Sequence, residues 1–202
     1  MFAKSTDNSA NHGGTARCGP RTVVISEPHP YTPFLRYGAH QYAKVFARHG
    51  WKVVLLSASF NLWRIFLASP GIDQEYLALW RERGRLVQPN LINYCLAHIL
   101  PTQFRFREPF SRIAHKLYSP SIRSILNTQN IQCADLLWLN GDRDWLLRKA
   151  IPHSKLLVRI IDYYSGFNSR YDNYHPMLQE TLRCADGVFT CSERVKELYT
   201  GL

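Results

Sequence analysis

Short apolar runs alternate with amphipathic, helix-like segments along this chain. The run at 21–26, RTVVIS, is rich in β-branched residues and predicts a buried strand. Between 36 and 49, apolar residues recur at the spacing of one helix face, and Gly50 ends the pattern as a helix C-terminal glycine does. The run at 51–57, WKVVLLS, predicts a second strand. A strand, a helix and a strand within about 35 residues form a βαβ unit, which implies parallel strands and a right-handed crossover.

The same alternation returns in the second half of the chain. Strands are expected at 135–140, 155–161 and 187–191, and helices at 142–150, 175–184 and from Ser192 onward. The middle fits less clearly, because 91–100 suits either a strand or a buried helix, and 109–127 is predicted helical despite Pro120. Short strands that are apolar on both faces and separated by helices predict an α/β fold, a doubly wound Rossmann-like parallel sheet flanked by helices.

Polar residues follow three of the predicted strands. Ligands of doubly wound sheets bind beyond the carboxyl ends of the strands, so these positions are candidates for a site. They are Ser26, Glu27 and His29 after the first strand, Asn140 and Asp142 after the strand at 135–140, and Asp162 after the strand at 155–161. The carboxylate of Asp162 either meets a ligand there or caps the turn that follows it.

The length and charge of the chain narrow the picture further. Residues 1–20 are polar and are expected to form a flexible tail, and 21–202 are expected to form one domain. Lys and Arg exceed Asp and Glu by 25 to 15, a net charge of +10. This surplus favours anionic partners: nucleic acid, phosphorylated metabolites or an anionic membrane surface.

The five cysteines are scattered and form no Cys-x-x-Cys pair, so neither a zinc site nor a redox motif is indicated. We expect reduced thiols in a cytoplasmic protein. The N-terminal segment contains no apolar run that resembles a signal peptide. No stretch approaches the roughly 18 apolar residues of a membrane span, so any membrane contact is expected to be peripheral.

Three segments of the chain resemble glycosyltransferases of the GT-B fold. HQYAKVFARHGWKVVLLS, 40–57, is similar to their first helix and second strand, with Trp51 in place of the usual histidine. LRCADGVFTCSERVKELY, 182–199, resembles the family pattern R-x-A-D-x-V-x-x-x-S, and LLVRIIDYYSGF, 156–167, resembles a segment of a bacterial subgroup that builds cell-surface polysaccharides. The three segments occur in the order and with the spacing that the family has.

This resemblance implies a two-domain enzyme whose N-terminal Rossmann-like domain holds the acceptor and whose C-terminal domain binds the nucleotide-sugar. The chain is then the acceptor-side half, transferring a sugar from a nucleotide-sugar to a saccharide or lipid-linked acceptor in cell-envelope polysaccharide synthesis. No cofactor or metal is expected on this half, and catalysis is expected to need a donor domain, on a longer chain or on a partner chain. The alternative is a non-catalytic or truncated Rossmann-like binding module that needs a partner chain.

The resemblance also assigns roles to individual residues. Asp162 is the expected catalytic residue, accepting the proton of the acceptor hydroxyl or holding a sugar hydroxyl. The expected substrate-binding residues are Glu27, His29, Tyr31, Gly38, Asn140, Asp142, Tyr163 and Ser165. In the family a glycine-rich loop follows the first strand, whereas here only Gly38 is available. A rigid surface turn is therefore the alternative interpretation of the proline-rich loop that carries His29.

Two segments, 60–70 and 100–110, interleave arginines with large aromatic residues. Exposed, they would favour an anionic bilayer surface and a peripheral position at the inner face of the membrane. The same composition suits single-stranded nucleic acid, or core aromatics beside arginines whose charged ends reach water. Nucleic acid ranks last, because the basic residues are dispersed and no recognition motif occurs.

Overall fold

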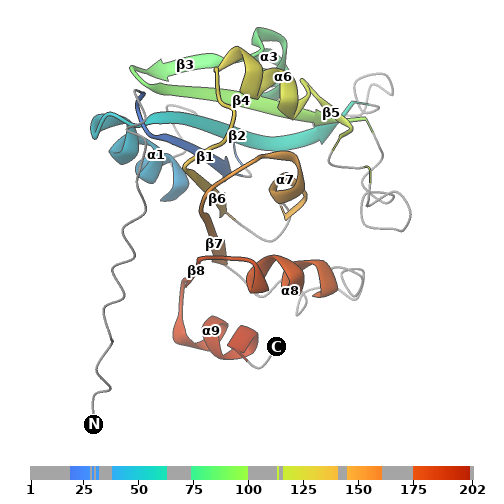
Figure 1. The fold of residues 1–202 in the computed structure, drawn as a ribbon. Helices are drawn as coiled ribbons and strands as arrows, with labels where there is room; N and C mark the ends of the chain where they lie inside the picture. The colour runs from blue at the N-terminus through green and yellow to red at the C-terminus, as the bar shows by residue number, and fades with distance from the viewer. Residues whose placement is uncertain are drawn as a thin grey trace.

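The computed structural model describes residues 19–27, 29, 31, 38–62, 74–99, 113, 116–140, 145–160 and 175–200. These residues form a sheet flanked by helices on both faces (Figure 1). Its strands are β1 Thr22–Glu27, β2 Lys52–Asn61, β3 Arg85–Gln88, β4 Leu91–His98, β5 Tyr118–Ser119, β6 Leu136–Asn140, β7 Leu156–Ile160 and β8 Gly187–Thr190. The helices are α1 Gly38–Arg48, α3 Gln74–Glu82, α6 Ile122–Thr128, α7 Trp145–Ala150, α8 His175–Arg183 and α9 Glu193–Thr200.

The order of the strands identifies the fold class. The sheet runs β3-β4-β2-β1-β6-β7-β8, with β5 paired to β4. Every neighbouring pair from β4 to β8 is parallel, whereas β3 and β5 each lie antiparallel to β4. Without these two additions, the six parallel strands follow the order 3-2-1-4-5-6 of doubly wound dinucleotide-binding folds. The predicted α/β Rossmann-like class is confirmed.

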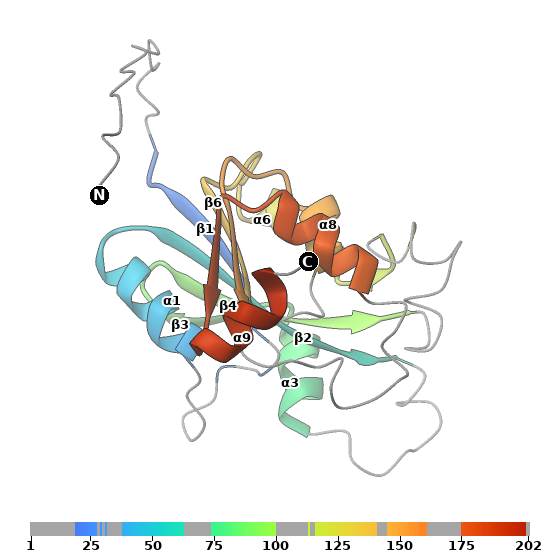
Figure 2. The same cartoon turned by 90° about the horizontal axis from the view of Figure 1, so that it is seen from below.

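The central strands β1, β4 and β6 are buried on both faces because helices cover both. Side chains alternate along β1, so that Val23 and Ile25 face α1 while Val24 faces the opposite layer. The α1 face of the core includes the small residues Ala39, Ala43 and Ala47, which lie on one side of the helix. The opposite face is covered by α6, α7 and α8, and Figure 2 shows α1 on one side of β1 and β6 and α8 on the other.

The middle of the chain corrects one prediction and resolves another. The segment at 91–100 is a strand, β4, rather than a buried helix. The predicted helix at 109–127 is wrong at Tyr118–Ser119, which pairs with β4 as β5, whereas its last part, 122–127, is helical as predicted and belongs to α6. Proline has no N–H to donate within a helix, and α6 begins only after Pro120, where the Ser121 hydroxyl accepts from the backbone N–H of Ser124.

Within the described ranges, no helix is both long and apolar enough to cross a membrane. Most of the basic and aromatic segments, 63–70 and 100–110, lies outside the described residues, so their proposed membrane contact stays a prediction. Phe60, at the start of the first segment, packs edge-on against Trp80 with ring centroids 5.8 Å apart.

Candidate functional site

The order of the strands reverses between β1 and β6. The chain leaves β1 towards β2 on one side and later returns to pair β6 with β1 on the other side. Such a switch point opens a crevice outside the carboxyl ends of the two strands, where doubly wound folds bind ligands. Glu27 is the last residue of β1 and Asn140 is the last residue of β6. Ile25 pairs with Trp138, and the same register continued by two residues places Glu27 level with Asn140.

The side chains of Glu27 and Asn140 are joined in the protein interior. Asn140 Nδ2 donates to Glu27 Oε2 at 2.5 Å, and the two residues are 1% and 2% exposed, respectively. The other carboxylate oxygen accepts from the backbone N–H of His29 at 3.3 Å, and the backbone N–H of Asn140 donates to Ser26 Oγ at 3.0 Å. A buried carboxylate needs such partners, because leaving water without them costs several kcal/mol or more. Two of the predicted site residues are therefore in direct contact.

A third strand extends this row with a cation. Asn140 pairs with Arg159 across β6 and β7, and Arg159 Nη1 donates to Asn140 Oδ1 at 3.3 Å. The amide of Asn140 thus accepts from a guanidinium and donates to the carboxylate of Glu27, an arrangement that uses both ends of the amide. We call Glu27, Asn140 and Arg159 the switch-point row.

The prediction from sequence missed Arg159, although a signal was present. Arg159 interrupts the apolar run LLVRII, and a charged residue inside a strand that is otherwise buried requires a specific environment. That environment comes from α1. The guanidinium carbon lies 5.7 Å from the centre of the Tyr42 ring, and a Cβ atom on Gly38 would lie 2.7 Å from Arg159 Nη1. The predicted residue Gly38 therefore joins the site by leaving room for a side chain.

The two described residues between β1 and α1 hold to different elements, Tyr31 to the sheet and His29 to α1. The backbone N–H of Tyr31 donates to Asn93 Oδ1 at 3.0 Å, and Asn93 in turn donates to Ser57 Oγ at 2.7 Å. The backbone carbonyl of His29 lies 3.2 Å from His40 Nε2. Burial lowers the pKa of the His29 side chain, which favours neutral imidazole at pH 7. His29 thus reaches Glu27 through its backbone, while Tyr31 is held further along the sheet, at β4.

The remaining predicted site residues are not placed. Asp162, Asp142, Tyr163 and Ser165 lie outside the described residues. Asp162 follows the end of β7 at Ile160 by two positions along the chain. Its role as catalytic residue therefore stays a prediction.

The family-like segment near the C-terminus has a structural role. The carboxylate of Asp186 accepts from the backbone N–H of Leu156 at 2.8 Å and from Lys155 Nζ at 2.7 Å, which ties the start of β8 to the start of β7. The hydrogen bonds from Lys155 and Leu156 lower the pKa of the Asp186 carboxyl. The Ser192 hydroxyl accepts from the backbone N–H of Val195 at 3.3 Å at the first turn of α9. Asp186 lies at the amino ends of β7 and β8, at the opposite edge of the sheet from the switch-point row.

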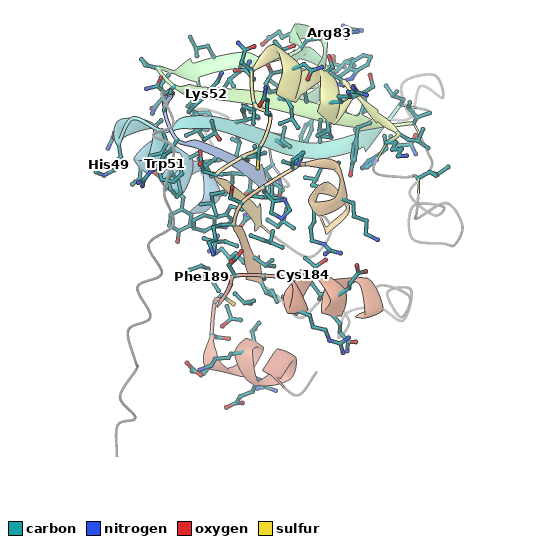
Figure 3. All side chains as sticks on the ribbon, in the orientation of Figure 1. His49, Trp51, Lys52, Arg83, Cys184 and Phe189 are labelled. Atoms are coloured by element: carbon teal, nitrogen blue, oxygen red, sulfur yellow. The ribbon has the colours of Figure 1, made fainter. Side chains whose placement is uncertain are left out.

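A groove also opens at that opposite edge, beside the start of β1 and the loop before β6. Arg21, Asn130, Gln132 and Asp135 are among the residues that line it. Trp51 and Lys52, labelled in Figure 3, lie at the same edge at the start of β2. Asp135 is already engaged, since its carboxylate accepts from the backbone N–H of Thr22 at 2.8 Å. Parallel doubly wound sheets bind ligands at the carboxyl ends of their strands, so we place the candidate site at the switch-point row.

The described residues contain no group of three or more His, Cys, Asp or Glu side chains placed to hold a metal ion. Glu27 and Asn140 are buried and hydrogen-bonded to each other, so the half-buried guanidinium of Arg159 is the member of the row with the most exposure, and it is suited to charge pairing. No protein-family model and no curated protein matches this chain. The structure thus defines a class, an α/β domain with the strand order of a Rossmann-like fold and a polar row at its switch point.

Proposed function

We propose that this chain is the acceptor-side domain of a GT-B glycosyltransferase, acting in cell-envelope polysaccharide synthesis at the cytoplasmic face of the membrane. The enzyme transfers a sugar from a nucleotide-sugar to a saccharide or lipid-linked acceptor. The observation that carries this proposal is the Glu27–Asn140 pair, 2.5 Å apart at the switch point of a Rossmann-like sheet. The three family-like segments of the sequence support it independently.

The chemistry of the row suits a sugar. A carboxylate accepts hydrogen bonds from hydroxyl groups, and an amide both donates and accepts, so a saccharide that displaced the present partners of this buried pair would find both kinds of group. Buried polar groups that are already ordered lose little conformational entropy when a ligand arrives. Glu27 and Asn140 would then orient the acceptor, and Asp162 would take the proton from the hydroxyl that attacks the donor sugar.

The proposal requires a nucleotide-sugar site in a second domain. Co-expression of the chain with the product of an adjacent donor-domain gene tests it directly. The assay measures nucleoside diphosphate release from a panel of nucleotide-sugars, and transfer of labelled sugar to saccharide and lipid-linked acceptors. We expect transfer with the pair of proteins, and loss of transfer with Asp162→Asn while the unfolding midpoint stays unchanged.

One variant and a measurement of saccharide binding separate the proposal from its rival. Glu27→Gln keeps the shape of the side chain but removes the charge, and we expect a raised KM for the acceptor with a smaller effect on the KM for the nucleotide-sugar. Saccharide binding without transfer for any donor partner would contradict the enzyme and favour the non-catalytic binding module. Absence of both binding and transfer would overturn the proposal entirely.

A further inference from the structure

We infer that Arg159 binds an anionic group, a phosphate or a carboxylate, on the saccharide that occupies the switch-point row. The saccharide part of this inference rests on the proposed function, whereas the anion part rests on the environment of Arg159 alone. Arg159 is thus assigned as a binding residue for a charged sugar.

Among the described residues, Arg159 forms no direct ion pair with a carboxylate, and Glu27 is linked to it only through the side chain of Asn140. The Arg159 side chain is half-buried, and its hydrogen bond within the described part of the chain goes to the neutral oxygen of Asn140, at 3.3 Å. Two other cations of this chain lie beside carboxylates, since Arg148 is 2.6 Å from Glu180 and Lys155 is 2.7 Å from Asp186. A guanidinium carries five N–H donors, and the described residues accept from Arg159 in this one long hydrogen bond. A half-buried guanidinium keeps contact with water, and an anionic ligand would replace part of that water with charge-assisted hydrogen bonds.

The guanidinium is also held in place rather than free to move into water. It lies against the ring of Tyr42, and it occupies the space beside Gly38 that any larger residue would fill. Stacking on an aromatic ring orients the planar fork of an arginine and lowers the entropy it loses when an anion binds. An arginine fixed in this way is suited to bidentate contact with a phosphate or a carboxylate.

Two exposed aromatic residues lie near the cation in the fold: Tyr42 packs against its guanidinium, and Phe189 is its neighbour on the adjacent strand. Tyr42 is 40% exposed on α1, and Phe189, paired with Arg159 across β7 and β8, is 50% exposed. Figure 3 labels Phe189 on β8. Both rings are near parallel to the Trp138 ring, at interplanar angles of 22° for Tyr42 and 14° for Phe189. A charged group beside aromatic rings, next to hydroxyl-binding side chains, is the usual composition of a small-molecule site.

The ligand chemistry follows from the whole row. Arg159 contacts Asn140, which contacts Glu27, so a sugar whose hydroxyls reach the carboxylate would carry its anionic group towards the guanidinium. Two kinds of sugar offer such a group, a sugar phosphate and a uronic acid. Glucose 6-phosphate and glucuronate are therefore the two arms of the test, with neutral glucose and inorganic phosphate as controls.

The experiment is isothermal titration of the whole chain with each of the four probes. We expect at least one anionic sugar to bind more tightly than glucose, and the tighter of the two identifies the source of the anion. Arg159→Gln should weaken that binding by about tenfold or more, as expected for loss of a charge-assisted hydrogen bond. Arg123→Gln is the matched control, because it removes the same charge from an exposed position on α6 and should leave affinity within about twofold.

Gly38→Ala provides a second variant that protects the test against misfolding. Alanine is a better helix former than glycine, so this change at the first residue of α1 should not reduce stability. Its methyl group would lie 2.7 Å from Arg159 Nη1 and would displace the guanidinium, so we expect the same loss of affinity as in Arg159→Gln.

The outcomes separate the two proposals. If wild-type protein binds neither anionic probe, or if both variants bind as wild type does, the inference about Arg159 is wrong. If inorganic phosphate binds as tightly as glucose 6-phosphate and the binding needs Arg159, the anion site stands and the saccharide site does not. If glucose binds as tightly as both anionic sugars and all are insensitive to Arg159→Gln, the saccharide site stands and the anion site does not.

Discussion

The hydrogen bond between Asn140 and Glu27 predicts a large stability loss on replacing Asn140 with alanine. The substitution removes the donor that lies 2.5 Å from Glu27 Oε2, and it removes the acceptor used by Arg159 Nη1. Both members of the pair are almost fully buried, so water does not replace the lost partner without rearrangement. The backbone hydrogen bond of Asn140 to Ser26 is retained in the variant, which confines the change to the side chain.

The size of the effect follows from these contacts. A hydrogen bond to a charged group contributes about 1.5–3 kcal/mol, and the deleted side-chain atoms add a small cavity cost. We therefore expect the free energy of unfolding to fall by about 2–4 kcal/mol. With a urea dependence of about 2 kcal/mol/M, this corresponds to a midpoint lower by about 1–2 M. Such a loss is a large share of the roughly 5–15 kcal/mol that stabilises an ordinary domain.

Urea unfolding followed by circular dichroism measures the change, and a double-mutant cycle with Glu27→Gln isolates the pair. In the Glu27→Gln background the acceptor is neutral, so Asn140→Ala should cost about 1–2 kcal/mol less than it does alone. Asn127→Ala is the control, because Asn127 is exposed on α6, and its effect should stay within about 0.5 kcal/mol. A loss below about 0.5 kcal/mol for Asn140→Ala, or an equal loss in both backgrounds, would refute the role assigned to the pair.

Three further predictions test other parts of the fold. Burial raises the pKa of the Cys95 thiol to about 12, so a thiol reagent should label exposed Cys184 in the native protein and Cys95 only after unfolding. Peptide mass spectrometry locates the label, and labelling of Cys95 in the native protein would contradict its burial. Gly50→Ala should lower the free energy of unfolding by about 1–2 kcal/mol, because φ there is +78°. Gly84→Ala should lower it more, because φ there is +122° and the added Cβ would also lie 2.7 Å from the ring of Tyr94. Equal losses of stability in urea unfolding would argue against that contact. Hydrogen bonds from a lysine and a backbone N–H lower the pKa of Asp186, so its ionised form stabilises the fold above pH 3.8, and this contribution disappears as pH falls through the lowered pKa. Asp186→Asn should therefore reduce Tm at neutral pH and match wild type in acid. A difference in Tm that is independent of pH would exclude the effect.

The central strands were predictable because their signal is local. β1 and β6 are largely apolar runs that are buried on both faces, and β2 in its first half and β7 on alternate residues are buried as well, so each run is visible without knowing its neighbours. The strands β3 and β5 carry no such signal. β3 is half-exposed and β5 has two residues, so both are strands because they pair with β4. Pairing of this kind depends on the partner strand and is invisible to periodicity.

The candidate site divides in a similar way. Glu27 and Asn140 could be proposed from sequence, because each ends an apolar run and parallel strands present their carboxyl ends at one edge. Their hydrogen bond could not, since it depends on the register between β1 and β6. Arg159 was missed because its environment comes from α1, a helix far away in the sequence.

The sequence alone determined the α/β fold class of this protein. Its apolar runs alternate with amphipathic segments, and because the runs must be buried on both sides, helices are required on both faces of a largely parallel sheet. Only the tertiary structure decided that the order of strands reverses between β1 and β6, and that Glu27, Asn140 and Arg159 become neighbours there. The physical reason is the range of the forces involved. Burial of an apolar run is a property of the run itself, whereas a hydrogen bond or a charge left without a partner is a property of residues that meet only when the chain has folded.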